Sequence, residues 1–235
     1  MKKKMYAMLA TELIGTALLT LVVLAVKSSA IGIAYFIALA IGLAYTGLIF
    51  FANFEEEQAN ARWIPQFNPA LTVALWTVKK IKTLELLLNV VMQFLGAYLA
   101  YLLFSYLINN KLPNIAAHYS TRTLVAEAIG TFIFVLVVAA SVYKNYVGTV
   151  SAAVGGAAYA VGVLVASSAS NALINPAVAL GVHSFSWTVY VLGPVVGAII
   201  AINLYSLLYA EKDSKTKPVA AKTKPVAAKS VVKKK

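Results

Sequence analysis

Two short stretches of identical sequence decide the fold of this chain: Asn68-Pro69-Ala70 and Asn175-Pro176-Ala177. Asparagine is among the best N-cap residues, proline is favoured at the first helical position, and alanine has the highest helix propensity. Each stretch therefore predicts the start of a helix. The apolar runs that they open, residues 68–78 and 175–182, are too short to cross a bilayer, which takes about 20 residues.

The composition predicts that these short helices belong to a membrane protein. The chain has 235 residues, of which 61% are hydrophobic and 12% charged, and its mean hydropathy is +0.81. Soluble domains have about 25% charged residues. Nine of the 20 Lys and Arg follow residue 211, so the net charge of +12 is mainly a property of the tail and does not predict a nucleic-acid partner. The chain has no cysteine, and we expect no metal, no cofactor and no enzymatic activity.

Six longer apolar stretches predict transmembrane helices, at residues 5–26, 31–54, 84–108, 124–143, 149–168 and 187–209. The two short runs predict re-entrant half-helices, because irregular backbone at membrane depth persists only inside protein or beside a water-filled cavity. Seventeen of the 20 Lys and Arg fall on one side of this topology. That bias predicts an integral protein of the cell membrane with both termini in the cytoplasm.

The two halves of the chain, about 5–108 and 122–209, repeat the same order of motifs. Thr11-Glu-Leu-Ile-Gly-Thr16 matches Ala126-Glu-Ala-Ile-Gly-Thr131, and each is followed by a second span, an Asn-Pro-Ala stretch and a third span. Three spans per half is an odd number, so the second half must be inverted across the membrane. The sequence thus predicts an all-α membrane domain over 1–210, with an inverted 3+3 repeat whose site lies near the midplane.

Half-helices that meet at the midplane predict a narrow pore for neutral, hydrogen-bonding molecules. Each helix N-terminus carries roughly half a positive charge, which repels cations. We expect the amides of Asn68 and Asn175 to face the lumen as donors. A water molecule that accepts from both is oriented so that it interrupts a proton-conducting chain.

Two carboxylates, Glu12 and Glu127, occupy equivalent positions within apolar spans. A charge at the bilayer centre costs at least about 2.5 kcal/mol, so such residues face the bundle interior and have partners. We assign both to bracing the half-helix loops, whose backbone N–H groups need acceptors. Proton transfer is the alternative role.

Two further stretches lie outside the repeated motifs. Residues 55–62 predict a solvated loop, with an acidic collar at the inner pore mouth as the alternative. Residues 211–235 repeat a Lys/Pro-rich heptad and predict a disordered cytoplasmic tail. That tail is either a solubilising extension or a segment attracted to anionic membrane lipids.

The doubled Asn-Pro-Ala and the paired Glu-x-x-Gly-Thr motifs resemble the aquaporin, or major intrinsic protein, family. Gln93 followed by Gly96-Ala97 resembles the third span of that family. The resemblance covers about residues 5–210. It implies a right-handed bundle of six helices with two half-helices, one pore per subunit, a homotetramer, and passive flow of water and sometimes glycerol.

The filter positions depart from the pattern of the family. The arginine that usually follows the second motif Asn by three residues is Val178, and the histidine of water-selective members is Val163. The filter position before the second motif is Ala172, and on the second span Tyr35 and Ile41 are the candidates. Losing the arginine removes a fixed charge and five donors. We therefore expect a wider, drier filter that admits glycerol-sized solutes, and weaker exclusion of charge.

These patterns predict a passive channel for water and small neutral solutes. One alternative is a structural or junction membrane protein with little conduction. The other is a proton-coupled carrier, which needs titratable groups along the path, and Glu12 and Glu127 are the ones that qualify.

Overall fold

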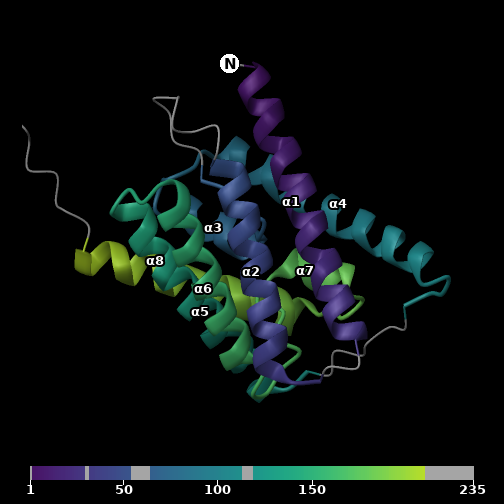
Figure 1. Cartoon of the computed structure of the whole chain (residues 1–235). Coiled ribbons are helices and arrows are strands. Elements are labelled where there is room, and N and C mark those ends of the chain that lie inside the picture. Colours follow the sequence, from purple (N-terminus) through teal and green to yellow (C-terminus); the bar gives the residue numbers. More distant parts are fainter. Residues whose placement is uncertain (1, 30–31, 54–63, 113–118, 210–235) are drawn as a thin grey trace, which may run out of the picture.

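The computed structural model describes residues 2–29, 32–53, 64–112 and 119–209, and these form helices and no strands (Figure 1). In chain order the long helices are α1 (Lys2–Ser28), α2 (Ala34–Asn53), α4 (Thr83–Leu107), α5 (Thr121–Tyr143), α6 (Gly148–Ala166) and α8 (Gly193–Tyr209). Two short helices, α3 (Pro69–Thr77) and α7 (Pro176–Gly181), lie among them. The predicted tail at 211–235 and the stretch 55–62 lie outside the described residues.

Six helical segments of the described chain are long and apolar enough to cross a membrane. They have 19 to 25 residues, which matches the thickness of the hydrocarbon core. The prediction of six spans and two half-helices is confirmed, and the helix limits differ from the predicted ones by at most a few residues. Because six spans bring the chain back to its starting side, we call the two faces the N-terminal side and the opposite side.

The last span is less regular than the sequence predicts. It begins as η2, a π-helical segment at Trp187–Leu192, and becomes α-helical only at Gly193. Pro194 follows, and proline has no N–H to donate and crowds the carbonyl four residues before it. The wider π turn relieves that crowding ahead of the proline.

Glycines let the long helices cross at short range. A Cβ on Gly96 of α4 would collide with the Leu13 carbonyl of α1, and one on Gly197 of α8 would collide with the Ala128 carbonyl of α5. The two crossings occupy equivalent places in the two halves. Close packing through small residues is typical of helices in lipid.

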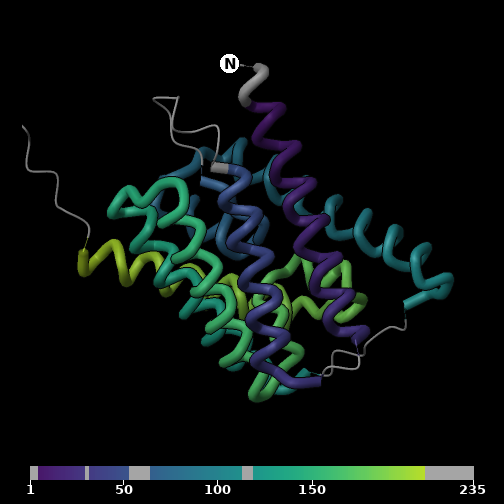
Figure 2. The backbone as a smooth tube through the Cα atoms, viewed as in Figure 1, coloured from purple at the N-terminus to yellow at the C-terminus, as the bar shows by residue number. Residues whose placement is uncertain are grey.

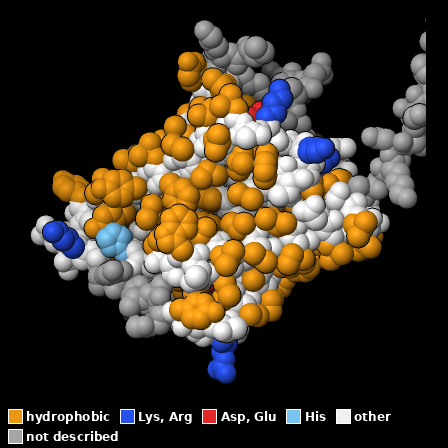
Figure 3. Space-filling model, turned by 180° about the vertical axis from the view of Figure 1, so that it is seen from behind, with side chains coloured by type: hydrophobic (Ala, Val, Ile, Leu, Met, Phe, Trp, Pro, Cys, Tyr) orange, Lys and Arg blue, Asp and Glu red, His pale blue; other side chains and the backbone are white. Residues whose placement is uncertain are grey.

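The polar groups lie inside the bundle and the apolar side chains cover much of its surface. Glu12, Asn68, Gln93, Glu127 and Asn175 have no exposed surface. Figure 3 shows one face dominated by apolar side chains, with Lys and Arg near its edges. In Figure 2, α1 and α2 run side by side, and the faces of these two helices that point away from the bundle form part of its surface. A surface of this kind fits the hydrocarbon of a bilayer.

Candidate functional site: the meeting point of the half-helices

The side chains of the two motif asparagines cap the half-helices. Asn68 Oδ1 accepts a hydrogen bond from Ala70 N at 2.9 Å. Asn175 Oδ1 accepts from Ala177 N at 3.0 Å and from Val178 N at 3.3 Å. Each asparagine has extended backbone and is followed by proline at the first helical position. The local sequence alone therefore fixes the start of each half-helix.

The same two amides also join the half-helices to each other. Asn68 Nδ2 donates to the Ile174 carbonyl at 2.9 Å, and Asn175 Nδ2 donates to the Phe67 carbonyl at 2.8 Å. Each asparagine thus bonds to the residue immediately before its counterpart. An amide nitrogen carries two hydrogens, so each side chain keeps one N–H beyond this cross-link. Both side chains are fully buried, and no surface of either is open to a water molecule in this structure.

A glutamate on the first helix of each half holds the segment that leads into the half-helix. Glu12 accepts from Gln66 N and Phe67 N, both at 2.8 Å. Glu127 accepts from Leu173 N at 3.0 Å and from Ile174 N at 2.6 Å. In both halves these donors are the two residues before the motif asparagine.

The residues just before the asparagines adopt left-handed backbone. Phe67 has φ 52° and Ile174 has φ 42°, and Ala172 has φ 52°. A non-glycine residue in this region costs about 1–3 kcal/mol and persists only where its surroundings hold it. The carboxylates provide that hold, because Phe67 N and Ile174 N are among the groups they accept from.

The remaining partners of the two carboxylates differ between the halves. Gln93 Nε2 donates to Glu12 at 2.7 Å and to Thr72 Oγ1 at 2.9 Å. Glu127 has no matching glutamine, and Ser170 Oγ donates to it at 2.6 Å instead. The first half therefore fixes its carboxylate through a neighbouring span, and the second half through its own loop.

Three of the predicted filter residues are buried close to the second half-helix. Val163 is 2% exposed, Ala172 is 7% exposed and Val178 is fully buried. Ala172 and Val178 flank Asn175 in sequence, and Val163 lies near the end of α6 on the opposite side. The structure does not test their role in selecting solutes, which stays a prediction.

Tyr35 is not buried with these residues, and its role as a filter residue stays a prediction. It is 56% exposed, and it recurs at four-residue spacing with Leu39 and Leu43, which are equally exposed. This spacing places all three on the outward face of α2. Ile41, the second candidate, is 1% exposed and lies on the buried face of the same helix.

A cation lies against the loop that precedes the second half-helix. The Lys27 ammonium, at the end of α1, donates to the Asn171 carbonyl at 2.9 Å and is half-buried. Asn171 directly precedes Ala172. No sequence pattern connects Lys27 with this loop, because 144 residues separate the two partners.

Sequence reasoning also missed a pair of tyrosines between the two motifs. Tyr45 of α2 and Tyr159 of α6 are each 1% exposed, and their rings stack with centroids 4.8 Å apart. The Tyr45 hydroxyl donates to the Gln66 carbonyl at 3.0 Å. Helical spacing could have found the pair, because Tyr45 follows Ile41 by four residues and Tyr159 precedes Val163 by four.

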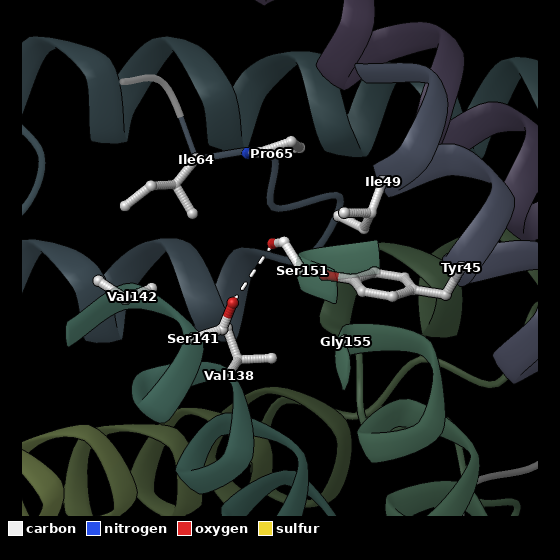
Figure 4. Close-up of a pocket in the computed structure, with 9 residues that line it drawn as sticks. All are labelled: Tyr45, Ile49, Ile64, Pro65, Val138, Ser141, Val142, Ser151 and Gly155. Atoms are coloured by element: carbon white, nitrogen blue, oxygen red, sulfur yellow. Dashed lines mark hydrogen bonds between the residues drawn. The ribbon is translucent and has the colours of Figure 1, made fainter. Parts of the chain in front are cut away.

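A small pocket of about 20 Å³ opens from the N-terminal side and reaches Tyr45. Figure 4 shows Tyr45 extending from α2 towards Val138 and Ser141 of α5. Ser141 and Ser151 lie 3.3 Å apart in the same wall, joined by a hydrogen bond. The volume is that of about one water molecule.

The arrangement defines a class of protein: an integral membrane protein with an inverted repeat, in which two capped half-helices meet tip to tip inside six spans. The family model of the major intrinsic proteins matches residues 65–205, more than half of the chain. The chain belongs to that family. It is accordingly a membrane channel for water or small solutes and not an enzyme.

Individual relatives agree with this assignment. The chain is 30% identical over 169 residues to a probable aquaporin AqpM of Archaeoglobus fulgidus, a match that covers 61% of this chain and 67% of the relative. It is 32% identical over 153 residues to aquaporin NIP1-1 of Zea mays, covering 60% of this chain and 54% of the relative. The solved aquaglyceroporin of Plasmodium falciparum has a similar fold, with a TM-score of 0.62 at 20% identity over 86% of this chain and 96% of that one.

Proposed function

We propose that the protein is a passive channel for water and for small uncharged solutes of the size of glycerol, with its passage running beside Asn68 and Asn175. The observation that carries this proposal is the reciprocal bond between the two half-helices, in which each amide nitrogen bonds across to the other half. That geometry brings two helix N-termini together and leaves one N–H on each amide. A passing hydroxyl or water oxygen can accept from these donors.

The filter supports a solute range wider than water alone. Ile41, Val163, Ala172 and Val178 offer no charge and no side-chain donor. A hydrophobic constriction discriminates poorly between water and a small polyol, because it makes no specific hydrogen bond that one of them would lose. The names of the plant and archaeal relatives and of the aquaglyceroporin are consistent with either water or a small polyol as the transported solute.

A flux experiment with a matched pair of variants tests the proposal. Val163 and its neighbour Leu164 lie side by side on α6, but Val163 is 2% exposed and Leu164 is 43% exposed. In proteoliposomes studied by stopped-flow light scattering, the wild type should pass water and glycerol faster than protein-free vesicles. Val163→Trp should abolish that excess, and Leu164→Trp should retain it. A wild type equal to protein-free vesicles would overturn the proposal.

A structural role with little conduction is the second candidate, and one observation favours it. Both motif asparagines are fully buried, so water has no access to them in this structure. The same flux measurement separates the two functions. A proton-coupled carrier would differ from both, because an imposed proton gradient would accumulate its solute.

The proposal also includes the orientation of the channel in the membrane and its assembly with other subunits. Lys79, Lys80 and Lys144 belong to the N-terminal side, whereas Lys111 and Arg122 belong to the opposite side. We propose that the N-terminal side faces the cytoplasm. Outward apolar faces then contact lipid and, in a homotetramer, the neighbouring subunits. Light scattering of the detergent complex, corrected for bound detergent, gives the subunit number.

A further inference from the structure

The inward faces of α2 and α6 form a ladder of side chains along the proposed passage. From the opposite side to the N-terminal side, α2 presents Ile41, Tyr45 and Ile49, each buried and four residues from the next. α6 runs the other way and presents Val163, Tyr159 and Gly155. The two helices touch closely, because a Cβ on Gly42 would come within 2.7 Å of the Gly156 carbonyl.

The tyrosines form the middle level of this ladder. The predicted filter residue Val163 lies one helical turn from Tyr159 on one side. On the other side the pocket is lined by Tyr45, Ile49 and Gly155. A solute that moves from the filter to the pocket therefore has to pass the level at which Tyr45 and Tyr159 stack.

Both rings are held next to the asparagines. The Tyr45 hydroxyl donates to the Gln66 carbonyl, two residues before Asn68. The Tyr159 hydroxyl lies near the side chain of Asn175. Phe134 packs edge-on against both tyrosines, with centroids at 5.5 Å from Tyr45 and 4.9 Å from Tyr159. Both asparagines, next to these rings, are fully buried.

The two phenols are not equally fixed. Tyr45 has a hydrogen-bond acceptor in the Gln66 carbonyl, whereas the buried Tyr159 hydroxyl meets the side chain of Asn175 and has no acceptor for its own hydrogen among the residues that the structure describes. A buried polar group without a partner is unfavourable and attracts any polar molecule that reaches it. The Tyr159 O–H, which has no acceptor, can thus donate to the oxygen of a hydroxyl group on a passing solute.

We propose that the stacked Tyr45–Tyr159 pair is the constriction that determines which solutes pass this channel, and that a solute crosses this level only when the two rings separate. The inference rests on the proposed channel function and deepens it. According to this inference, the two tyrosine rings beside the asparagines select solutes, in addition to the predicted filter on the opposite side. The rings exclude by size, and the Tyr159 hydroxyl favours solutes that carry a hydroxyl group.

Removing the rings should increase flux, which a merely structural role of the tyrosines would not do. In proteoliposomes with matched protein content, Tyr45→Ala/Tyr159→Ala should raise glycerol permeability over wild type by at least about fivefold and should admit larger polyols such as erythritol. Tyr159→Phe keeps the ring but removes the hydroxyl, so it should lower glycerol permeability relative to water permeability and should not admit erythritol. Tyr205→Ala is the cavity control, because Tyr205 is a buried tyrosine whose ring packs at a tilt against Tyr143 of α5 instead.

The outcomes separate this inference from the channel function itself. If the double variant passes glycerol no faster than a conducting wild type, the constriction is elsewhere and the channel function stands. If the double variant conducts and the wild type does not, the rings do block the passage, but the proposed function of the wild type as a passive channel fails. If folded wild type and double variant both equal protein-free vesicles, both proposals fail. Should the alanine variant not fold, Tyr45→Leu/Tyr159→Leu also removes the rings and preserves more of the core volume.

Discussion

Glu12 and Glu127 lie 115 residues apart in the sequence, yet each accepts backbone hydrogen bonds from the two residues that precede a motif asparagine. The carboxylates act on equivalent segments that enter from opposite sides of the membrane. A carboxylate has two oxygens and can accept from both N–H groups of a segment at once. We propose that this geometry, and not proton transfer, explains a buried acidic group in each half.

Replacing Glu12 by glutamine should destabilise the protein. The carboxylate accepts from Gln66 N, Phe67 N and Gln93 Nε2, and a glutamine side chain would turn an NH₂ group towards at least one of these donors. The loss of a buried acceptor costs about 1–3 kcal/mol. For a chain of this size that lowers the thermal midpoint by roughly 2–12 °C. Differential scanning fluorimetry in detergent measures the change.

Glu85 provides the matched control for this substitution. It lies in the first turn of α4 and accepts from Lys82 N at 3.0 Å near the surface. Water can replace that bond, so Glu85→Gln should move the midpoint much less than Glu12→Gln. Equal midpoints for Glu12→Gln and wild type would contradict the bracing role.

The two functions of the Asn68 side chain can be separated by two substitutions. Asn68→Ala removes both the cap on Ala70 N and the bond to the Ile174 carbonyl, and should cost about 1–3 kcal/mol. Asn68→Asp keeps an acceptor for the cap but replaces the donor with an oxygen that faces the Ile174 carbonyl. If the cross-link between the half-helices matters more than the cap, Asn68→Asp should be at least as unstable as Asn68→Ala.

Urea-dependent unfolding in mild detergent measures both variants. Asn203→Ala is a suitable control, because Asn203 Nδ2 bonds to Thr77 Oγ1 in an exposed position. An Asn68→Asp variant as stable as wild type would show that the cap on Ala70 N, without the bond to the Ile174 carbonyl, accounts for the stabilising effect of Asn68.

Much of this fold follows from local signals in the sequence. The length of each apolar run predicted the spans, because a helix must be long enough to cross the bilayer. The Asn-Pro pairs predicted the starts of α3 and α7, because a helix cap depends on a few neighbouring residues. The π-helical start of the last span depends on how Pro194 packs against the preceding turn, and no local sequence pattern predicts it.

The candidate site was predictable only where the two halves repeat each other. The repeat pointed to Glu12 and Glu127 together, since each is the second residue of the same repeated motif. The sequence could not choose between Tyr35 and Ile41 on the second span, because an apolar span carries no polar–apolar alternation that distinguishes its inward face from its lipid-facing one. Tyr45 and Tyr159 lie on different spans, and only packing of α2 against α6 brings their rings to 4.8 Å.

The helix crossings predict opposite effects for two glycine-to-alanine substitutions. At Gly96 a Cβ would collide with the backbone of α1, so Gly96→Ala should lower stability by about 1–3 kcal/mol. At Gly47 of α2 a Cβ would meet no atom within 4 Å, so Gly47→Ala should be neutral or stabilising by up to about 1 kcal/mol. Thermal midpoints in detergent compare them. A Gly96→Ala variant as stable as Gly47→Ala would mean that α1 and α4 can move apart freely.

The position of Lys27 suggests how the channel excludes ions although Val178 stands where the family usually has an arginine. Its ammonium bonds to the Asn171 carbonyl, one residue before the predicted filter residue Ala172, and so adds positive charge beside the α7 dipole to a loop that also binds the Glu127 carboxylate. Lys27→Met should therefore raise the proton leak of proteoliposomes by at least about twofold, while water permeability stays within about twofold of wild type. A pH-sensitive dye inside vesicles clamped with valinomycin measures the leak. Lys27→Arg keeps the charge and should behave as wild type, and a Lys27→Met leak no greater than that of Lys27→Arg would remove Lys27 from the account of charge exclusion.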